Sequence, residues 1–199
     1  DTGSRGLGDV YKRQEEVRVK FKKFINAYNS DEIIFTKGCT EGFNLLANSL
    51  CKNLSKGDEI ILSEIEHHAN IIPWQMAAKK YGLNIKYIKI DDSYNLDLDH
   101  LNSLLTSKTK IVSIVGESNM SGMLPNIKDI VSNVKSKSDA IFILDGAQLV
   151  PHRFVDVQDL GIDFLCVSGH KMLGPTGIGV VWGRNCLLYT SPSPRDPVS

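Results

Sequence analysis

The chain of 199 residues lacks the features that define several protein classes. Its four cysteines, at positions 39, 51, 166 and 186, form no C-x-x-C pair, so a zinc or dithiol site is not indicated. Scattered single cysteines are typical of a reducing compartment. No apolar run approaches the roughly 20 residues needed to cross a bilayer, and residues 1–8 have no signal-peptide core. We therefore expect a cytoplasmic protein with no membrane partner.

The charge balance lacks an excess of either sign. Lys plus Arg number 23 and Asp plus Glu number 23, so the formal net charge is zero. A neutral chain has no general field that would attract nucleic acid or anionic lipid, which favours a small-molecule substrate. With 42% hydrophobic and 23% charged residues, the composition is ordinary for a globular protein with a buried core.

The two ends of the sequence differ from its middle. Residues 1–14 are rich in glycine at the start and show no hydrophobic period, and residues 187–199 contain three prolines among Ser, Arg and Asp. We interpret residues 1–14 as a non-native leader and residues 186–199 as a non-native tail. Residues 15–185 then form the folded domain.

Short β-branched runs alternate with helical patterns through the middle of the chain. The candidate strands are Ile33–Thr36, Glu59–Ser63, Ile85–Ile90, Lys110–Val115, Ala140–Asp145, Phe164–Ser168 and Gly177–Gly183. The candidate helices are Glu15–Tyr28, Thr40–Leu54, Asn70–Tyr81, Asp97–Leu105 and Asn126–Lys137. This alternation predicts an α/β fold, a three-layer sandwich around a mostly parallel, seven-stranded sheet. No clear helix joins the last two strands, so the final strand is expected to run antiparallel.

Polar side chains follow five of the predicted strands. These segments are 37–42, 64–70, 116–119, 145–148 and 168–171, and they bring Lys, Asp, Asn and His residues to strand ends. Ligands of an open parallel sheet bind at the carboxyl ends of its strands. A purely structural protein has no reason to gather these groups at one edge, so the pattern predicts a functional site there.

Each of these residues also has a structural interpretation. Thr40 could serve only in the first turn of a helix, and of His67 and His68 one could be exposed and one a cap. Asp145 could cap a turn through Gly146. Most lysines are surface charges, but Lys171 lies between an apolar strand and a Gly-Pro loop, where burial would leave its amine nucleophilic.

Taken together, the groups match one ligand. That ligand is pyridoxal 5′-phosphate, PLP. A helix start can bind its phosphate, and Lys171 can form a Schiff base with its aldehyde. Asp145 supplies a carboxylate for the pyridinium nitrogen, and His67 supplies an imidazole that can stack on the ring. Asn119 and Gln148 would then hydrogen-bond the ring oxygen. The metalloprotease motif H-E-x-x-H is absent, so no metal is expected.

Three separated motifs occur in an order that resembles a known family. They are Glu66–Gln75 (EHHANIIPWQ), Asp145–Gln148 (DGAQ) and Ser168–Lys171 (SGHK), the last followed by Gly174–Gly179 (GPTGIG). They resemble cysteine desulfurases of the SufS/group II NifS-like type, which are class V aminotransferase-fold enzymes. The resemblance runs from about Glu15 to Asn185 and covers the large, cofactor-binding domain.

The resemblance implies a fold and a set of roles. The fold is PLP-dependent fold type I, and the family's enzymes are homodimers. Lys171 would carry the cofactor, and His67 would stack on it and act in proton transfer. The remaining cofactor contacts would come from Cys39, Thr40, Asn119, Asp145, Gln148, Ser168 and His170. The implied reaction converts L-cysteine to L-alanine and passes sulfur, as a persulfide on an enzyme cysteine, toward iron–sulfur cluster assembly, where an acceptor protein can take it.

The sequence also departs from the family pattern. Cys39 stands where the family usually has Thr, so one phosphate contact would come from the backbone alone, and Gly116 stands where a His is frequent. None of the four cysteines occupies the motif of the persulfide cysteine, which lies in the family's C-terminal region with the substrate-binding arginine. We therefore expect this chain alone not to complete desulfuration. The alternatives are another class V enzyme (an aminotransferase, selenocysteine lyase or epimerase) and a catalytically inert fragment.

Overall fold

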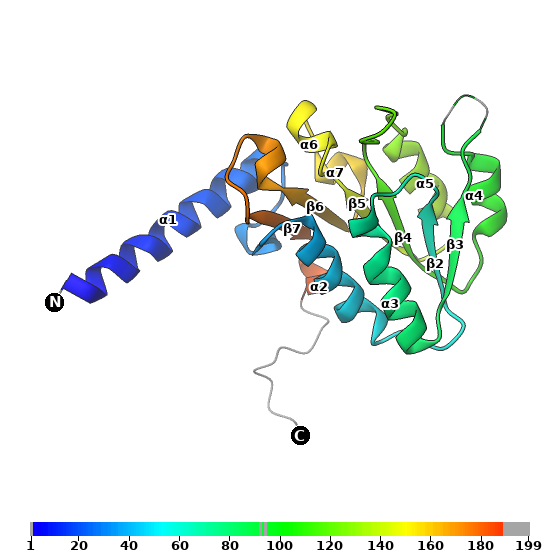
Figure 1. Ribbon diagram of the computed structural model, residues 1–199, viewed down its shortest axis with the longest axis horizontal. Coiled ribbons are helices and arrows are strands. Elements are labelled where there is room, and N and C mark those ends of the chain that lie inside the picture. The colour runs from blue at the N-terminus through cyan, green and yellow to red at the C-terminus, as the bar shows by residue number, and fades with distance from the viewer. Residues whose placement is uncertain (1, 92, 94, 189–199) are drawn as a thin grey trace, which may run out of the picture.

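A computed structural model describes residues 2–91, 93 and 95–188. The fold is built around one β-sheet (Figure 1). The strands are β1 (Ile33–Thr36), β2 (Glu59–Ser63), β3 (Asn84–Ile88), β4 (Thr109–Val115), β5 (Ile141–Asp145), β6 (Phe164–Ser168) and β7 (Gly179–Gly183). All seven predicted strands are confirmed, with bounds within about two residues.

The sheet brings the carboxyl ends of most strands to one edge. Its order is β1-β7-β6-β5-β4-β2-β3, and β7 pairs antiparallel with both β1 and β6 while the other pairs are parallel. The expected antiparallel final strand is thus confirmed. Gly179, where β7 begins, pairs with Thr36 and with Ser168, where β1 and β6 end. Six strand ends and the start of the seventh therefore share the edge at which ligands are expected.

Helices cover both faces of the sheet. The α-helices are α1 (Thr2–Phe24), α2 (Cys39–Cys51), α3 (Ile72–Tyr81), α4 (Leu98–Leu104), α5 (Ile127–Lys137), α6 (Leu149–His152), α7 (Val157–Leu160) and α8 (Asn185–Leu188). Short 3₁₀ helices are η1 (Ser30–Glu32), η2 (His68–Asn70) and η3 (Gly169–Met172). None of the helices described combines the length and apolarity that a membrane crossing requires.

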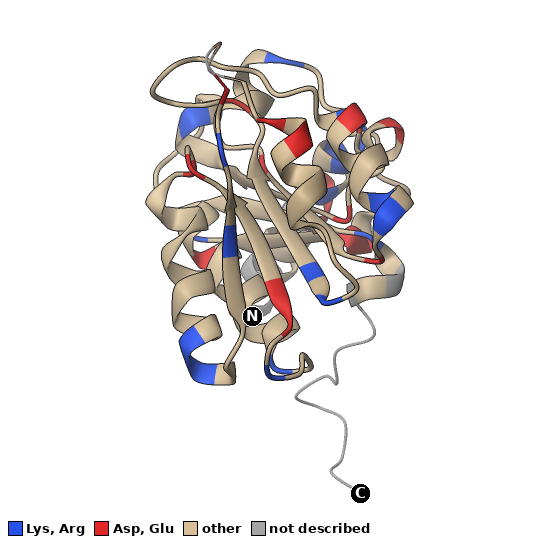
Figure 2. Ribbon diagram, turned by 90° about the vertical axis from the view of Figure 1, so that its right-hand side faces the viewer, with Lys and Arg blue, Asp and Glu red and all other residues tan. Residues whose placement is uncertain are grey.

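Alternating strand residues divide the interior into two cores. Ile60 and Leu62 of β2 face the core that includes α2 and α3, and Ile61 faces the core that includes α4 and α5. Because both faces are covered, the strands are nearly continuous apolar runs. Figure 2 shows the charged residues mainly on the outer helices, the loops and the strand ends. The three-layer sandwich predicted from the sequence is confirmed.

Local sequence signals set the helix bounds. Asp97 and Asn126, expected as first residues of two helices, are N-caps whose side chains accept hydrogen bonds from the His100 and Asp129 amides. The helix expected over 70–81 is divided into η2 and α3, with Pro73 in the first turn of α3. The expectation of one unbroken helix there was wrong.

The first helix differs from its predicted bounds. It begins at Thr2 rather than Glu15, because residues 2–24 contain no proline and residues 9–24 include many good helix formers. It ends at Phe24, before the predicted Tyr28, because Asn26 adopts a left-handed conformation with φ of 54°. Much of α1 extends away from the body of the molecule (Figure 1). Its expected apolar face is only partly buried: Ile25, just after the helix, is fully buried, whereas Val17 is 48% exposed.

Candidate functional site

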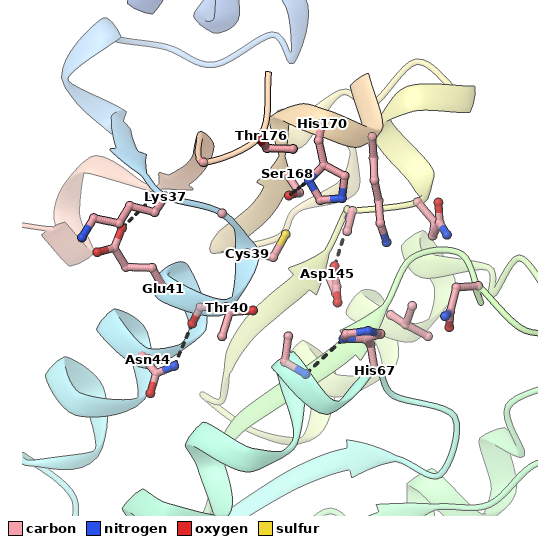
Figure 3. Close-up of a pocket in the computed structure, with 18 of the residues that line it drawn as sticks. Lys37, Cys39, Thr40, Glu41, Asn44, His67, Asp145, Ser168, His170 and Thr176 are labelled. Carbon is pink, nitrogen blue, oxygen red and sulfur yellow. Dashed lines mark hydrogen bonds between the residues drawn. The ribbon is translucent and has the colours of Figure 1, made fainter. Parts of the chain in front are cut away.

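A cavity of about 770 Å³ opens at the carboxyl edge of the sheet (Figure 3). Residues from the ends of five strands line it. All nine site residues predicted from the sequence are among them: Cys39, Thr40, His67, Asn119, Asp145, Gln148, Ser168, His170 and Lys171. The convergence of strand-end side chains inferred from the pattern is therefore present as one cavity.

The N-terminus of α2 forms one wall of the cavity. Gly38, the N-cap, has φ of 152°, and a Cβ placed on Gly179 would lie 2.6 Å from the Gly38 Cα. Two glycines thus let the start of α2 lie directly against β7. First-turn amides of a 13-residue helix have no partners within the helix and carry its positive dipole end. This wall can hold an anion.

Ser168 and His170 supply further polar groups near that wall. Ser168 Oγ and His170 Nδ1 are 3.0 Å apart, and Figure 3 shows the pair on the η3 side of the cavity, opposite Thr40. One member of the pair donates to the other, and the hydrogen that remains, on Ser168 Oγ or on His170 Nε2, can be donated to an oxyanion. Together with the helix start, they form a set of donors suited to a phosphate group.

Asp145 places a buried carboxyl group at the base of the cavity. It is 3% exposed at the end of β5, and its Oδ1 accepts a hydrogen bond of 2.9 Å from the Ala147 amide. Burial raises the pKa of Asp145, while the Ala147 hydrogen bond and the positive charges of Lys171 and His67 oppose that rise. One side chain thus accepts a hydrogen bond within the turn and also lines the cavity, and its pairing with a ligand nitrogen stays a prediction.

His67 presents its ring beside Asp145 (Figure 3). It is the N-cap of η2, and its Nδ1 accepts a hydrogen bond of 3.1 Å from the Ala69 amide. That bond fixes the ring and, in the neutral imidazole, places the proton on Nε2. His68 does not line the cavity, so His67 is the member of the pair that both caps and faces the site.

Lys171 lies in η3, directly after β6. It is half-buried rather than buried as expected, and residues 173–178 of the loop that follows are exposed. Of that loop, only Thr176 and Gly177 line the cavity. Lys37 is a second lysine among the described cavity residues, on the α2 side.

Several cavity residues were not singled out from the sequence. They are Lys37, Glu41, Asn44, Glu117 and Thr176. Lys37, Glu41 and Glu117 lie in strand-end segments that the pattern did indicate, but nothing in the sequence separates them from surface charges. Asn44 lies one helical turn after Thr40 and its Nδ2 donates to the Thr40 carbonyl oxygen, so the helical period could have identified it.

The aminotransferase class-V family profile matches residues 4–194. The chain belongs to this family. Members of the family use PLP, and the resemblance inferred from the three motifs is confirmed.

Individual relatives are cysteine desulfurases. The chain is 45% identical to the cysteine desulfurase of Serratia proteamaculans over 92% of its own length and 45% of the relative's. It is 43% identical to a probable cysteine desulfurase of Halalkalibacterium halodurans over 87% of its length and 43% of the relative's. The chain thus spans about half the length of the curated relatives it matches.

Solved structures show the same fold. The cysteine desulfurase CsdA from Escherichia coli superposes with a TM-score of 0.88 at 35% identity, covering 96% of this chain and 50% of that one. The apo cysteine desulfurase from Thermococcus onnurineus gives 0.85 at 37% identity, covering 93% and 47%. SspA, solved in complex with cysteine, gives 0.83 at 27% identity, covering 90% and 51%. These matches confirm that the sheet is that of the large domain of PLP fold type I enzymes.

Proposed function

We propose that the cavity binds PLP and that the chain forms the cofactor-binding half of a cysteine desulfurase. One observation carries the proposal: a single cavity contains an amine (Lys171), a buried carboxyl (Asp145) and a held imidazole (His67) beside a helix N-terminus. The names of the relatives support a desulfurase over the other class V activities.

The donor set of the cavity fits the chemistry of PLP. The amides at the start of α2, with Thr40, Ser168 and His170, would hold the phosphate, and Cys39 would contribute its amide there. Asp145 would pair with the ring nitrogen, His67 would lie on the ring face, and Asn119 and Gln148 would contact the ring hydroxyl. When bound, PLP supplies an electron sink for a carbanion formed at the substrate Cα.

The chain's own residues would then bind, orient and move protons. Lys171 Nζ would hold the cofactor covalently and afterwards carry a proton to and from the substrate Cα. The negative charge of Asp145 would favour the protonated ring nitrogen, because a buried carboxylate needs a cationic partner. The Ala69 amide would keep the His67 ring in place for proton transfer on the substrate side.

Sulfur transfer needs a reactive thiol in addition. In the proposed reaction L-cysteine becomes L-alanine and its sulfur passes to a cysteine thiolate as a persulfide, in support of iron–sulfur cluster assembly. Cys39, Cys51 and Cys166 are buried, and burial raises the pKa of each thiol, so none of these three is a suitable nucleophile. We propose that the accepting thiol and the substrate-binding arginine lie outside this chain, in a homodimer of the whole protein that serves a sulfur-acceptor protein.

The proposal is tested by loading the chain with PLP and adding amino acids. We expect L-cysteine to change the visible absorption of the bound cofactor at lower concentration than L-serine does, with no release of alanine, because none of the three thiols that the structure describes is a suitable nucleophile. Equal responses to the two amino acids would contradict the desulfurase assignment. Failure to bind PLP at all would contradict the cofactor site itself.

A further inference from the structure

Glu66 is a buried carboxyl group next to the cavity, and it does not line the cavity itself. It is 8% exposed. Its Oε1 accepts hydrogen bonds from the Ser63 hydroxyl and, at 2.9 Å, from the Val115 amide, and its Oε2 accepts from Asn70 Nδ2 at 2.7 Å. One side chain thus joins the end of β2, the end of β4 and the η2 turn.

The direction of each hydrogen bond in this network is fixed except at the Ser63 hydroxyl, which can donate or accept. Trp74 Nε1 and Ser113 Oγ both donate to Asn70 Oδ1, at 2.9 and 2.6 Å. Asn70 must therefore present its amide nitrogen to Glu66 Oε2, and the Val115 backbone can only donate to Oε1. Both oxygens of residue 66 must accept, a condition that a glutamine cannot meet because its NH₂ group would face another donor.

The two segments that Glu66 joins both form walls of the cavity. His67 follows Glu66 directly and caps the turn that contains Asn70. Val115 lines the cavity and leads into the segment that carries Glu117 and Asn119. The Gly116 amide also donates to the Asp145 carbonyl oxygen at 2.8 Å, which connects this wall to the buried carboxylate.

We propose that Glu66 is a positioning residue of the PLP site, whose two acceptor oxygens hold the His67 turn and the 115–119 segment in a fixed position relative to each other at the cavity. This inference rests on the proposed function, in which His67 contacts the ring face and Asn119 the ring hydroxyl, so that the relative position of the two segments matters. A preorganised binding site generally requires further residues that hold the ligand-contacting side chains in place.

The test compares Glu66→Gln with Ser113→Ala. Both remove one buried hydrogen bond from the same network, but Ser113 donates only to Asn70 and does not line the cavity. In the cofactor-free chain, the ¹⁵N spectrum of the His67 ring and hydrogen exchange of the Ala69 amide report whether the ring keeps its hydrogen bond. We expect E66Q to alter the ring signal and speed Ala69 exchange about tenfold, and S113A to leave both near wild type.

The second readout is the equilibrium affinity for PLP. We expect E66Q to weaken PLP binding about tenfold, because the loss of one buried hydrogen bond would displace the side chains that contact PLP. We expect S113A to change the affinity by less than about twofold. Equal effects of the two variants on the ring signal, or on affinity, would overturn the positioning role. If wild type does not bind PLP, the proposed function fails, yet the cofactor-free measurements still decide whether Glu66 positions His67.

Discussion

Glu66 and Asp145 are two buried carboxyl groups near one cavity, and their protonation depends on one another. Burial raises the pKa of Glu66 to about 8; hydrogen bonds from Ser63, Val115 and Asn70 oppose the rise, and the negative charge of Asp145 adds to it. At neutral pH Glu66 can therefore hold a proton, and the Ser63 hydroxyl can accept it because the other two neighbours must donate.

This protonation predicts a pH dependence of stability. The pKa of Glu66 is about 8 when folded and near the ordinary 4.5 when unfolded, so the folded state holds the extra proton between these values. Stability from this group is complete below about pH 4.5 and is lost as the pH rises to about 8. We expect the free energy of unfolding of wild type to fall, relative to E66Q, on the order of 1.4 kcal/mol per pH unit in this window. Parallel curves in urea titrations at pH 5, 6, 7 and 8 would contradict this.

The buried thiols predict low reactivity. Burial raises the pKa of Cys51 to about 12, and it also raises the pKa values of Cys39 and Cys166 well above the ordinary value. Because the thiolate is the reactive form, iodoacetamide should label these three residues in the native chain on the order of 100-fold more slowly than in urea. Mass spectrometry of the tryptic peptides measures each site separately. Fast labelling of Cys39 under native conditions would show that the start of α2 is open.

Gly116 predicts a steric limit on the cavity wall. A Cβ there would lie 2.8 Å from Leu149 Cδ2 and 3.2 Å from the Asp145 carbonyl oxygen. Gly116→His should therefore destabilise the fold by about 1–3 kcal/mol through overpacking. Adding Leu149→Ala should recover part of that loss, because it removes Cδ2, the nearest atom, but keeps the Leu149 Cβ at 3.1 Å and the backbone contact. A double-mutant cycle from thermal unfolding measures the coupling, and strict additivity would contradict the clash.

At the scale of elements, the cavity depends on the contact between α2 and β7. Gly38 and Gly179 meet where β1 ends, β7 begins and α2 starts, so two separate segments position the proposed phosphate site. The sequence predicted which segments converge, because each strand is marked by its own apolar run and the carboxyl ends of parallel strands share one edge of the sheet. It could not predict the close approach, which depends on pairs of residues far apart in the sequence.

This contact predicts an effect of Gly179→Ala on ligand binding. A Cβ at this position would lie 2.6 Å from the Gly38 Cα and 2.7 Å from the Val167 carbonyl oxygen, so the start of α2 must move. We expect at least a tenfold loss of PLP affinity. Gly57→Ala is the control: its φ of 88° makes alanine cost about 1–2 kcal/mol of stability, with nothing within 4 Å. Equal PLP affinity in the two variants would contradict the role of the contact.

At the scale of the whole molecule, the sequence predicted the layers, the seven strands and all nine proposed cofactor residues of the cavity. The features that were not predicted include the length of α1, the break between η2 and α3, the half-buried state of Lys171 and the network around Glu66. The end of α1 depends on a single left-handed residue, Asn26. The burial of Lys171 and the Glu66 network depend on contacts between side chains far apart in the sequence, and a one-dimensional pattern does not contain that information.

The chain spans about half the length of its curated relatives. Cofactor binding is the part of the proposed activity that we expect it to display by itself. The cavity offers two lysines among its described residues, Lys171 beside Asp145 and Lys37 on the α2 side. Of the two, Lys171 is the one whose charge acts on Asp145, so our proposal places the cofactor ring between Lys171 and that carboxyl group. The site can therefore be tested within one protein, by asking whether PLP reacts with Lys171 or with Lys37.

The most direct measurement is borohydride reduction of the chain mixed with PLP, followed by peptide mapping. We predict a stoichiometric adduct on Lys171, its loss in Lys171→Ala, and its retention in the matched variant Lys37→Ala. An adduct on Lys37 instead, or labelling spread over surface lysines and unchanged in Lys171→Ala, would contradict the account.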